Sequence, residues 1–148
     1  EQNVGFGLDF RHQPAISPSG KSQRVTQALQ EVGLLQAKSL YPNELSGGMA
    51  QRAALARCLA REPEIMLLDE PFSGVDPLAV YDVQQIITEL KQRGLGILIT
   101  DHNVRETLAV VDRAYLVCEG KILREGTSSF LISDPMSREL YLGPRFSM

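Results

Sequence analysis

Two short apolar runs, separated by a long amphipathic segment, most constrain the fold of this chain. Residues 65–68 (Ile-Met-Leu-Leu) and 96–100 (Gly-Ile-Leu-Ile-Thr) are continuous apolar runs. Such runs are typical of buried parallel strands with both faces covered. Between them, Asp76 and Pro77 predict the start of a helix and Gly94 predicts its end. A strand, a helix and a second strand in this order predict an α/β fold with a parallel sheet.

Apolar spacing and breaker residues predict the other elements. The polar segment 9–24, which contains prolines and a glycine, is predicted to be a loop. Helices are predicted at residues 24–31, 49–61, about 104–111 and 128–134, and a β-hairpin at 114–117 and 122–123 with its turn at Glu119-Gly120. The helix that starts at Pro77 is predicted to bury Val80, Val83, Ile86, Ile87 and Leu90.

Composition limits the class of protein. The chain has 148 residues, 43% of them hydrophobic and 22% charged, as expected for one globular domain. Its net charge of -3 argues against a general nucleic-acid binder. No apolar run approaches the roughly 20 residues needed to span a bilayer, and no secretory signal opens the chain. Cys58 and Cys118 lack metal-ligand spacing and are predicted to be reduced core thiols of a cytosolic protein.

A cluster of small residues, Ser46, Gly47 and Gly48, precedes a helix predicted to begin near Met49. Small residues let consecutive backbone N–H groups converge on an anion, and the helix dipole adds to their field. The alternative is an ordinary serine N-cap with a glycine turn. The motifs farther along the chain favour the anion site.

Two carboxylates, Asp69 and Glu70, follow the first predicted strand. The carboxyl ends of parallel strands are where α/β proteins bind their ligands. One carboxylate can help to hold Mg²⁺, and the other can polarise a water that attacks a phosphate. The alternative is a pair of solvated charges at a strand end.

His102 comes just after the second predicted strand. A neutral imidazole there can hydrogen-bond a phosphate oxygen and orient an attacking water, whereas a lone histidine after a strand is usually a surface or capping residue. Its place in Thr100-Asp101-His102, parallel to Asp69-Glu70 on a neighbouring strand, favours the functional interpretation. Asp76 is expected to cap the helix at Pro77.

Ser19-Gly20-Lys21-Ser22 resembles the end of a phosphate-binding P-loop. The full pattern, G-x-x-x-x-G-K-[ST], needs a glycine at position 15, where this chain has Ala15. No apolar strand precedes the segment. We therefore interpret it as a coincidence and Lys21 as a solvated surface charge.

Together, four motifs resemble the ATPase domain of the ATP-binding cassette (ABC) transporters over nearly the whole chain. They are Leu45-Ser46-Gly47-Gly48 with Gln51-Arg52, Ile65 to Pro71, Ser73-Gly74-Val75-Asp76, and Ile99-Thr100-Asp101-His102. The resemblance implies a partial P-loop NTPase core, a parallel sheet with flanking helices, plus a helical subdomain. Glu1-Gln2-Asn3-Val4 is similar to the stretch after the family's Gln loop. This implies that the P-loop and the N-terminal β-subdomain are missing and that the fragment alone is inactive.

The resemblance also implies cofactors, roles and partners. ATP and Mg²⁺ are the expected cofactors, with Asp69 on the metal and Glu70 and His102 as catalytic residues. The residues expected to contact the nucleotide held by a second subunit are Ser46, Gly47, Gly48, Gln51 and Asp76. Gly48→Asp is therefore expected to place a charge against the γ-phosphate. A head-to-tail dimer of ATPase subunits and integral membrane subunits are the implied partners, without nucleic acid, at the cytoplasmic face of the bacterial inner membrane.

Three regions follow from the same resemblance: a helical-subdomain portion at 1–50, the α/β core at 51–126, and a C-terminal helix and tail at 127–148. The second half, including residues 94–108 and Tyr141-Leu142-Gly143, is most similar to lipopolysaccharide-export ATPases. Residues 41–49 are more similar to ATPases of small-solute importers. Two further alternatives are a soluble ABC-type ATPase acting on DNA or ribosomes, and a non-catalytic interaction module.

Overall fold

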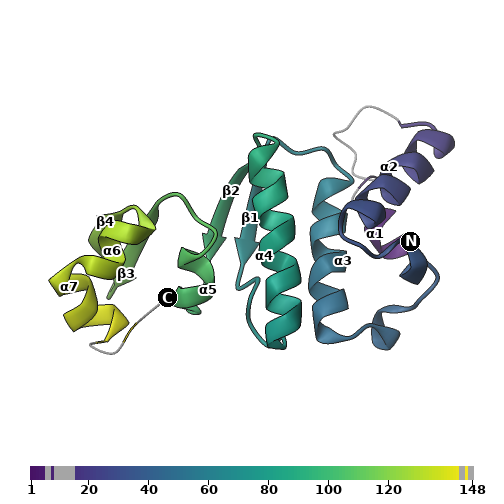
Figure 1. Ribbon diagram of the computed structural model, residues 1–148. Coiled ribbons are helices and arrows are strands. Elements are labelled where there is room, and N and C mark those ends of the chain that lie inside the picture. The colour runs from purple at the N-terminus through teal and green to yellow at the C-terminus, as the bar shows by residue number, and fades with distance from the viewer. Residues whose placement is uncertain (6–7, 9–15, 144–145, 147–148) are drawn as a thin grey trace. The chain divides into compact units, whose positions relative to one another are not determined.

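The computed structural model describes residues 1–5, 8, 16–143 and 146 (Figure 1). Residues 9–15 of the predicted loop lie outside this part of the chain. The chain divides into two compact units, Glu1–Thr100 and Asp101–Met148. Within the described ranges, no helix is both long and apolar enough to cross a membrane.

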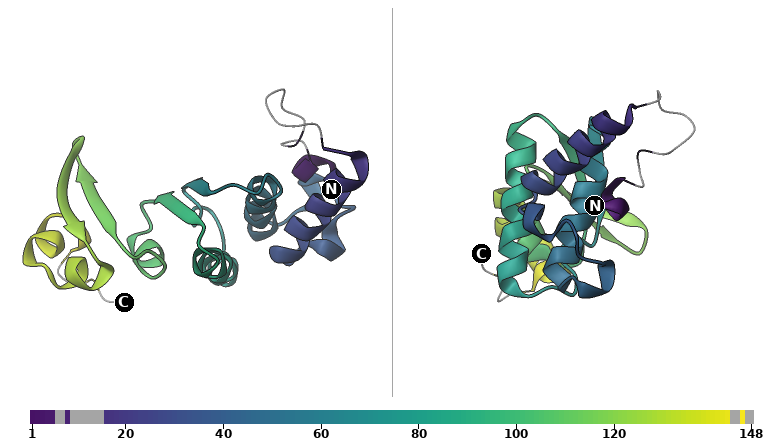
Figure 2. Two further views of the ribbon diagram at one scale, coloured as in Figure 1. Left: turned by 90° about the horizontal axis from the view of Figure 1, so that it is seen from above. Right: turned by 90° about the vertical axis from the view of Figure 1, so that its right-hand side faces the viewer.

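In its described residues, the first unit contains four α-helices and two parallel strands. The helices are α1 (Gln2–Gly5), α2 (Pro18–Glu31), α3 (Gly47–Leu59) and α4 (Pro77–Gln92), with 3₁₀ turns at Leu35–Ala37 and Pro42–Glu44. Helices α1 and α2 pack against each other and against α3, which also packs against α4 (Figures 1 and 2).

Helix α2 starts earlier than the sequence predicts. Residues 18–24 are helical, so the predicted loop is wrong over this stretch. The reason is a local cap: the Ser17 hydroxyl accepts a hydrogen bond from the Gly20 amide at 3.1 Å. Pro18, in the first turn, has a φ that suits a helix start and no N–H to satisfy there. The proline that suggested a loop therefore begins a helix.

Strands β1 (Ile65–Asp69) and β2 (Gly96–Thr100) form the predicted parallel pair, in register from Ile65↔Gly96 to Asp69↔Thr100. The prediction that both faces are buried is wrong. Met66 is 2% exposed, but Ile65 and Leu67 are 68% and 71% exposed. Successive side chains of a strand point to opposite faces, and α4 lies along one side of the pair (Figure 2). Only the face that carries Met66 is therefore well buried.

Helix α4 confirms its predicted start and end. The Asp76 carboxylate accepts hydrogen bonds from the amides of Leu78 and Ala79, both at 3.1 Å. Gly94, at φ +87, follows its C-terminus, in a conformation that glycine adopts without a steric cost. The buried residues are Ala79, Val83, Ile86, Ile87 and Leu90. Val80, which was predicted to be buried, is only half-buried, whereas Ala79 is buried where α4 approaches Gly48 of α3.

The second unit contains an antiparallel hairpin and short helices. In chain order these are α5 (Val104–Leu108), β3 (Ala114–Cys118), β4 (Lys121–Gly126), α6 (Ser128–Ser133), α7 (Pro135–Ser137) and the π-helical turn η4 (Arg138–Leu142). The predicted turn is confirmed, since Glu119 and Gly120 have φ values of +51 and +74, as a type I′ hairpin needs. Helix α5 ends at Leu108, earlier than the predicted 111.

A small core holds the second unit together. Leu108, Leu116 and Leu131 are buried, and Ile132 and Phe146 are among the partly buried side chains packed against them. The two cysteines are free, as predicted, but they are not core thiols: Cys58 is half-buried and Cys118 is exposed. Cys118 is the last residue of β3.

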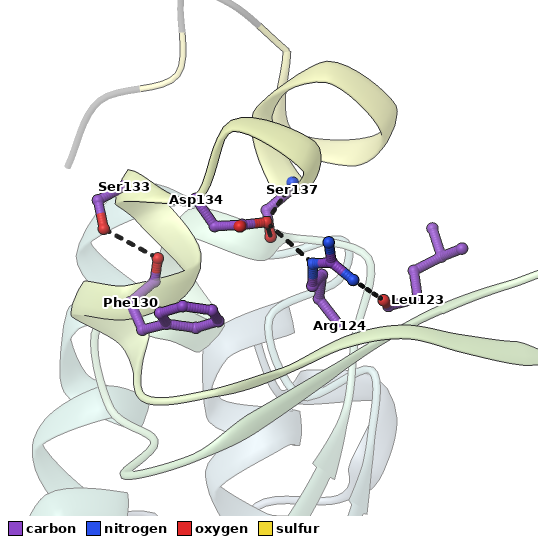
Figure 3. Close-up of polar contacts among 6 residues, drawn as sticks. All are labelled: Leu123, Arg124, Phe130, Ser133, Asp134 and Ser137. Carbon is purple, nitrogen blue, oxygen red and sulfur yellow. Dashed lines mark hydrogen bonds and ion pairs between the residues drawn. The ribbon is translucent and has the colours of Figure 1, made fainter.

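A cluster of polar contacts joins β4 to α6 and α7 (Figure 3). The Asp134 carboxylate accepts from the amide and the hydroxyl of Ser137, at 2.7 and 2.8 Å, and from Nε of Arg124 at 3.3 Å. These hydrogen bonds, above all those from Ser137, lower the pKa of Asp134 below its ordinary value of 3.8, since they favour the charged form. Ser137 is itself buried, at 2% exposure.

This cluster predicts an acid-sensitive contribution to stability. A depressed carboxyl pKa stabilises the fold above the unfolded-state value, and the contribution is lost as the pH falls through the folded-state value. In Asp134→Asn we expect lower stability at neutral pH and a shallower decline between about pH 5 and pH 2. Urea unfolding followed across this range by circular dichroism measures both.

Glu125→Gln is the matched control, because Glu125 pairs with Arg113 at 2.7 Å while both side chains are about half exposed. Exposed pairs contribute little, so this variant should follow the wild-type curve. If the free energy of unfolding of Asp134→Asn declined in parallel with that of the wild type throughout the acid range, the stabilising role of the Asp134 carboxylate would be contradicted.

Candidate functional site

The two predicted carboxylates lie where β1 ends. Asp69 is the last residue of β1 and Glu70 follows it, and both are exposed. Thr100, at the end of β2, is the register partner of Asp69. Its hydroxyl donates to Oδ1 of Asp69 at 2.5 Å, and its carbonyl accepts from the Glu70 amide at 2.7 Å. The carboxyl ends of the two strands therefore meet at two hydrogen bonds, which Thr100 makes with Asp69 and with Glu70.

The backbone at Glu70 is in the left-handed region, at φ +50. A non-glycine residue there is uncommon and costs free energy. Glu62 and Glu119 share this conformation, at a helix end and in the hairpin turn. The positive φ alone therefore does not distinguish Glu70. Its position beside Asp69, at the end of a parallel strand, does.

These residues fit a magnesium ion through their chemistry. Mg²⁺ prefers oxygen ligands, keeps several waters, and is commonly held by one or two carboxylates together with substrate phosphates. Asp69 supplies such a carboxylate. Among the described residues, no group of three or more His, Cys, Asp and Glu side chains could hold a metal ion. The Asp69 carboxylate therefore suits a Mg²⁺ site that has few protein ligands and is completed by phosphate and water.

The predicted anion nest is the N-terminus of α3. Ser46 is the N-cap, and its hydroxyl accepts from the Met49 amide at 3.3 Å. The helix begins at Gly47, slightly earlier than predicted. Ser46 and Gly47 are exposed, and the first amides of a helix have no partner within it. The cap and the anion site are therefore compatible: the hydroxyl closes the helix while the leading amides stay available.

Gly48 has a different role from Gly47. A Cβ on Gly48 would lie 2.4 Å from the Cβ of Ala79, so this glycine lets α3 and α4 approach closely. Gly48→Asp is therefore unsuitable as a test of phosphate contact, because the new side chain would disrupt the packing of α3 against α4 whether or not a nucleotide is bound. A Cβ on Gly47 would make ordinary contacts, the nearest at 3.5 Å from the Gly74 carbonyl oxygen.

The same contacts bring the predicted Asp76 segment to the nest. Gly47 faces Gly74 and Val75, and Asp76 caps the neighbouring helix α4. An ion pair between Arg52 and Asp82 joins α3 to α4 farther along. Sequence reasoning missed this pair. Gln51, a predicted contact residue, is half-buried on α3.

His102 lies in the second unit, with its side chain 66% exposed. The neighbouring Asp101 carboxylate is fully buried and accepts from the backbone amide and the side-chain amide of Asn103, at 2.7 and 2.8 Å. Nδ1 of His102 lies 4.0 Å from Oδ1 of Asp101. Asp101 thus fixes the turn that presents the histidine.

The P-loop-like segment lies in the first turns of α2. The Gly20 amide donates to the Ser17 hydroxyl, and the Lys21 amide donates to the Ser17 carbonyl at 2.9 Å. Both amides are therefore used at the start of the helix. Lys21 is half-buried rather than fully solvated.

Sequence and fold together define the class. The family model for ABC transporters matches residues 2–73, and solved ATP-binding cassettes share the fold. The chain is therefore related in sequence and fold to the ATP-binding subunits of ABC transporters.

Among its relatives, the chain is 44% identical over 133 residues to the lipopolysaccharide export system ATP-binding protein LptB of Acidithiobacillus ferridurans, covering 90% of this chain and 55% of the relative. It thus spans little more than half of that protein's length. It is similar in fold to MJ1267, an ATP-binding cassette of an ABC transporter, with a TM-score of 0.83 and 26% identity over 96% of this chain and 62% of that one. The cassette MJ0796, solved as a dimer in a post-hydrolysis state bound to ADP and Pi, gives a TM-score of 0.73 and 28% identity over 86% of this chain and 55% of that one.

Proposed function

We propose that this chain carries two parts of the ATP site of an ATP-hydrolysing transporter subunit. They are the carboxylates of Asp69 and Glu70 at the end of β1 and the anion nest at the start of α3. The observation that carries the proposal is the pair Asp69 and Glu70 at the end of β1, both bonded to Thr100 of β2. Asp69 would help to hold Mg²⁺, which neutralises charge on the phosphates when bound. Glu70 would accept a proton from the attacking water, and His102 would hydrogen-bond a phosphate oxygen.

The nest is proposed to act on a nucleotide held by a second subunit. Support comes from the exposed start of α3 at Ser46 and Gly47 and from its contact with the segment before Asp76. The similar cassette MJ0796 has been solved as a dimer. The residues proposed to contact the partner's nucleotide are Ser46, Gly47, Gly48, Gln51 and Asp76.

Lipopolysaccharide is the proposed cargo, because of the 44% identity to LptB. The proposed partners are integral membrane subunits, and the proposed location is the cytoplasmic face of the bacterial inner membrane. The regions 1–50, 51–126 and 127–148 keep the roles expected above. We also propose that residues 1–148 alone do not turn over ATP, because this sequence contains no G-x-x-x-x-G-K-[ST] pattern.

One experiment with three samples tests this function. Phosphate release is measured for residues 1–148 alone, for a subunit of the relatives' full length that carries them, and for that subunit in proteoliposomes with lipopolysaccharide-export membrane subunits. We expect no turnover by residues 1–148 alone and Mg²⁺-dependent turnover by the full-length subunit. In the proteoliposomes, we expect turnover to respond to lipopolysaccharide.

Each sample can contradict one part of the proposal. An inactive full-length subunit would remove the ATPase assignment. A complex that responds to an amino acid but not to lipopolysaccharide would favour the small-solute importer. Micromolar ATP binding by residues 1–148, measured by calorimetry, would contradict the inactivity of the isolated chain and would make Lys21 a candidate phosphate-binding residue.

A further inference from the structure

We propose that Thr100 is a positioning residue that holds both Asp69 and Glu70 in place for the hydrolysis described above; this inference rests on the proposed function. Thr100 uses two different groups for the two acidic residues. Its hydroxyl donates to Asp69 Oδ1 at 2.5 Å, and its backbone carbonyl accepts from the Glu70 amide at 2.7 Å. Both bonds arise because Asp69 and Thr100 are register partners at the last step of the sheet.

The hydroxyl bond matters for the carboxylate of Asp69. A threonine hydroxyl can donate one hydrogen bond, and here Oδ1 of Asp69 accepts it. This bond restrains the rotation of an exposed carboxylate, whose second oxygen stays available to a cation. Carboxylates that bind metals are usually held by such outer hydrogen bonds, and their loss typically costs about 10–100-fold in metal affinity or activity.

The carbonyl bond matters for the backbone of Glu70. At this residue the chain leaves β1 with φ +50 and turns, and the Ser73 amide donates to the Glu70 carbonyl at 3.1 Å. The bond from the Glu70 amide to Thr100 extends the strand pairing one residue past β1. A left-handed residue is thus held in place at both its amide and its carbonyl.

Side-chain substitutions separate the two bonds. Thr100→Val keeps the shape and the carbonyl but removes the hydroxyl, and Thr100→Ser keeps the hydroxyl. Thr88→Val is the matched control, because the Thr88 hydroxyl donates only within α4, to the Gln84 carbonyl at 2.8 Å. All variants are made in a subunit of full relative length that carries residues 1–148.

Two measurements test the role: ATP turnover against Mg²⁺ concentration, and Mn²⁺ binding in the presence of ADP by electron paramagnetic resonance. We expect Thr100→Val to lose about 10–100-fold in both turnover and Mn²⁺ affinity. We expect Thr100→Ser to recover both, and Thr88→Val to resemble wild type. Thermal unfolding measured for each variant separates lost positioning from lost folding.

The possible failures are distinct. Wild-type Mn²⁺ affinity in Thr100→Val would overturn the positioning role. The role would also be overturned if Thr88→Val lost as much turnover and Mn²⁺ affinity as Thr100→Val, with both losses proportional to the drop in thermal stability. A wild-type subunit without ATP turnover would remove the proposed function. In that case, weaker Mn²⁺ binding by Thr100→Val would still support the positioning of Asp69.

Discussion

Glu70→Gln is expected to lower ATP turnover by about 10²–10⁴-fold, the usual cost of losing a general base, while nucleotide binding is preserved. Glutamine has nearly the shape of glutamate but cannot accept the proton of the attacking water. The substitution leaves the backbone bond from residue 70 to Thr100 in place, so the strand end should keep its structure. Turnover by phosphate release and binding by calorimetry, in a full-length subunit, measure the two effects separately.

The chain provides a close control for this experiment. Glu119 is exposed and has φ +51, against +50 for Glu70, so Glu119→Gln makes the same change of charge in the same backbone conformation. It should turn over ATP like wild type. We also expect Glu70→Gln to accumulate the ATP-bound closed dimer, which size-exclusion chromatography would detect. Wild-type turnover in Glu70→Gln would refute the role of Glu70.

Gly47→Asp is expected to stop ATP-driven closure of the dimer without unfolding the subunit. Like charges brought together at an interface cost several kcal/mol, which corresponds to a loss of at least about 10²-fold. The fold should tolerate the change, because the nearest atom to a Cβ at Gly47 is 3.5 Å away. An acidic residue in a first helical turn is moreover stabilising by about 0.3–1 kcal/mol. Turnover and dimerisation are measured together with thermal unfolding.

Two other variants separate charge from packing. Gly47→Asn adds a side chain of nearly the same size without the charge and should retain much more activity. Gly48→Asp should unfold at lower temperature, because its Cβ would lie 2.4 Å from that of Ala79. Equal losses in Gly47→Asp and Gly47→Asn would show that size, rather than charge, blocks the site.

Mixed dimers test whether the nest acts on the partner's nucleotide. A Gly47→Asp subunit is combined with a full-length partner whose P-loop is inactivated. If the nest acts across the dimer, one site carries both defects and the other carries neither, so activity should exceed that of either parent. A verified mixed dimer that is no more active than its parents would count against this arrangement.

Local interactions explain which features the sequence could predict. The Asp76 cap, the glycine after α4 and the Glu119-Gly120 turn each depend on a few neighbouring residues, and all three are present. The order of strand, helix and strand likewise predicted the parallel pairing of β1 with β2. Because both strands then run in one direction, their polar ends had to meet at one edge, which brings Asp69 to the end of β2.

Contacts between distant segments were decided only by the tertiary structure. An apolar run does not reveal which of its faces is covered, so the exposure of Ile65 and Leu67 was not predictable. The two glycines of the nest look alike in sequence, and only the approach of α4 makes Gly48 a packing residue. Thr100 became a partner of both Asp69 and Glu70 through the register of the sheet. These properties depend on which segments fold against each other, since burial and close approach belong to pairs of elements and not to either one alone.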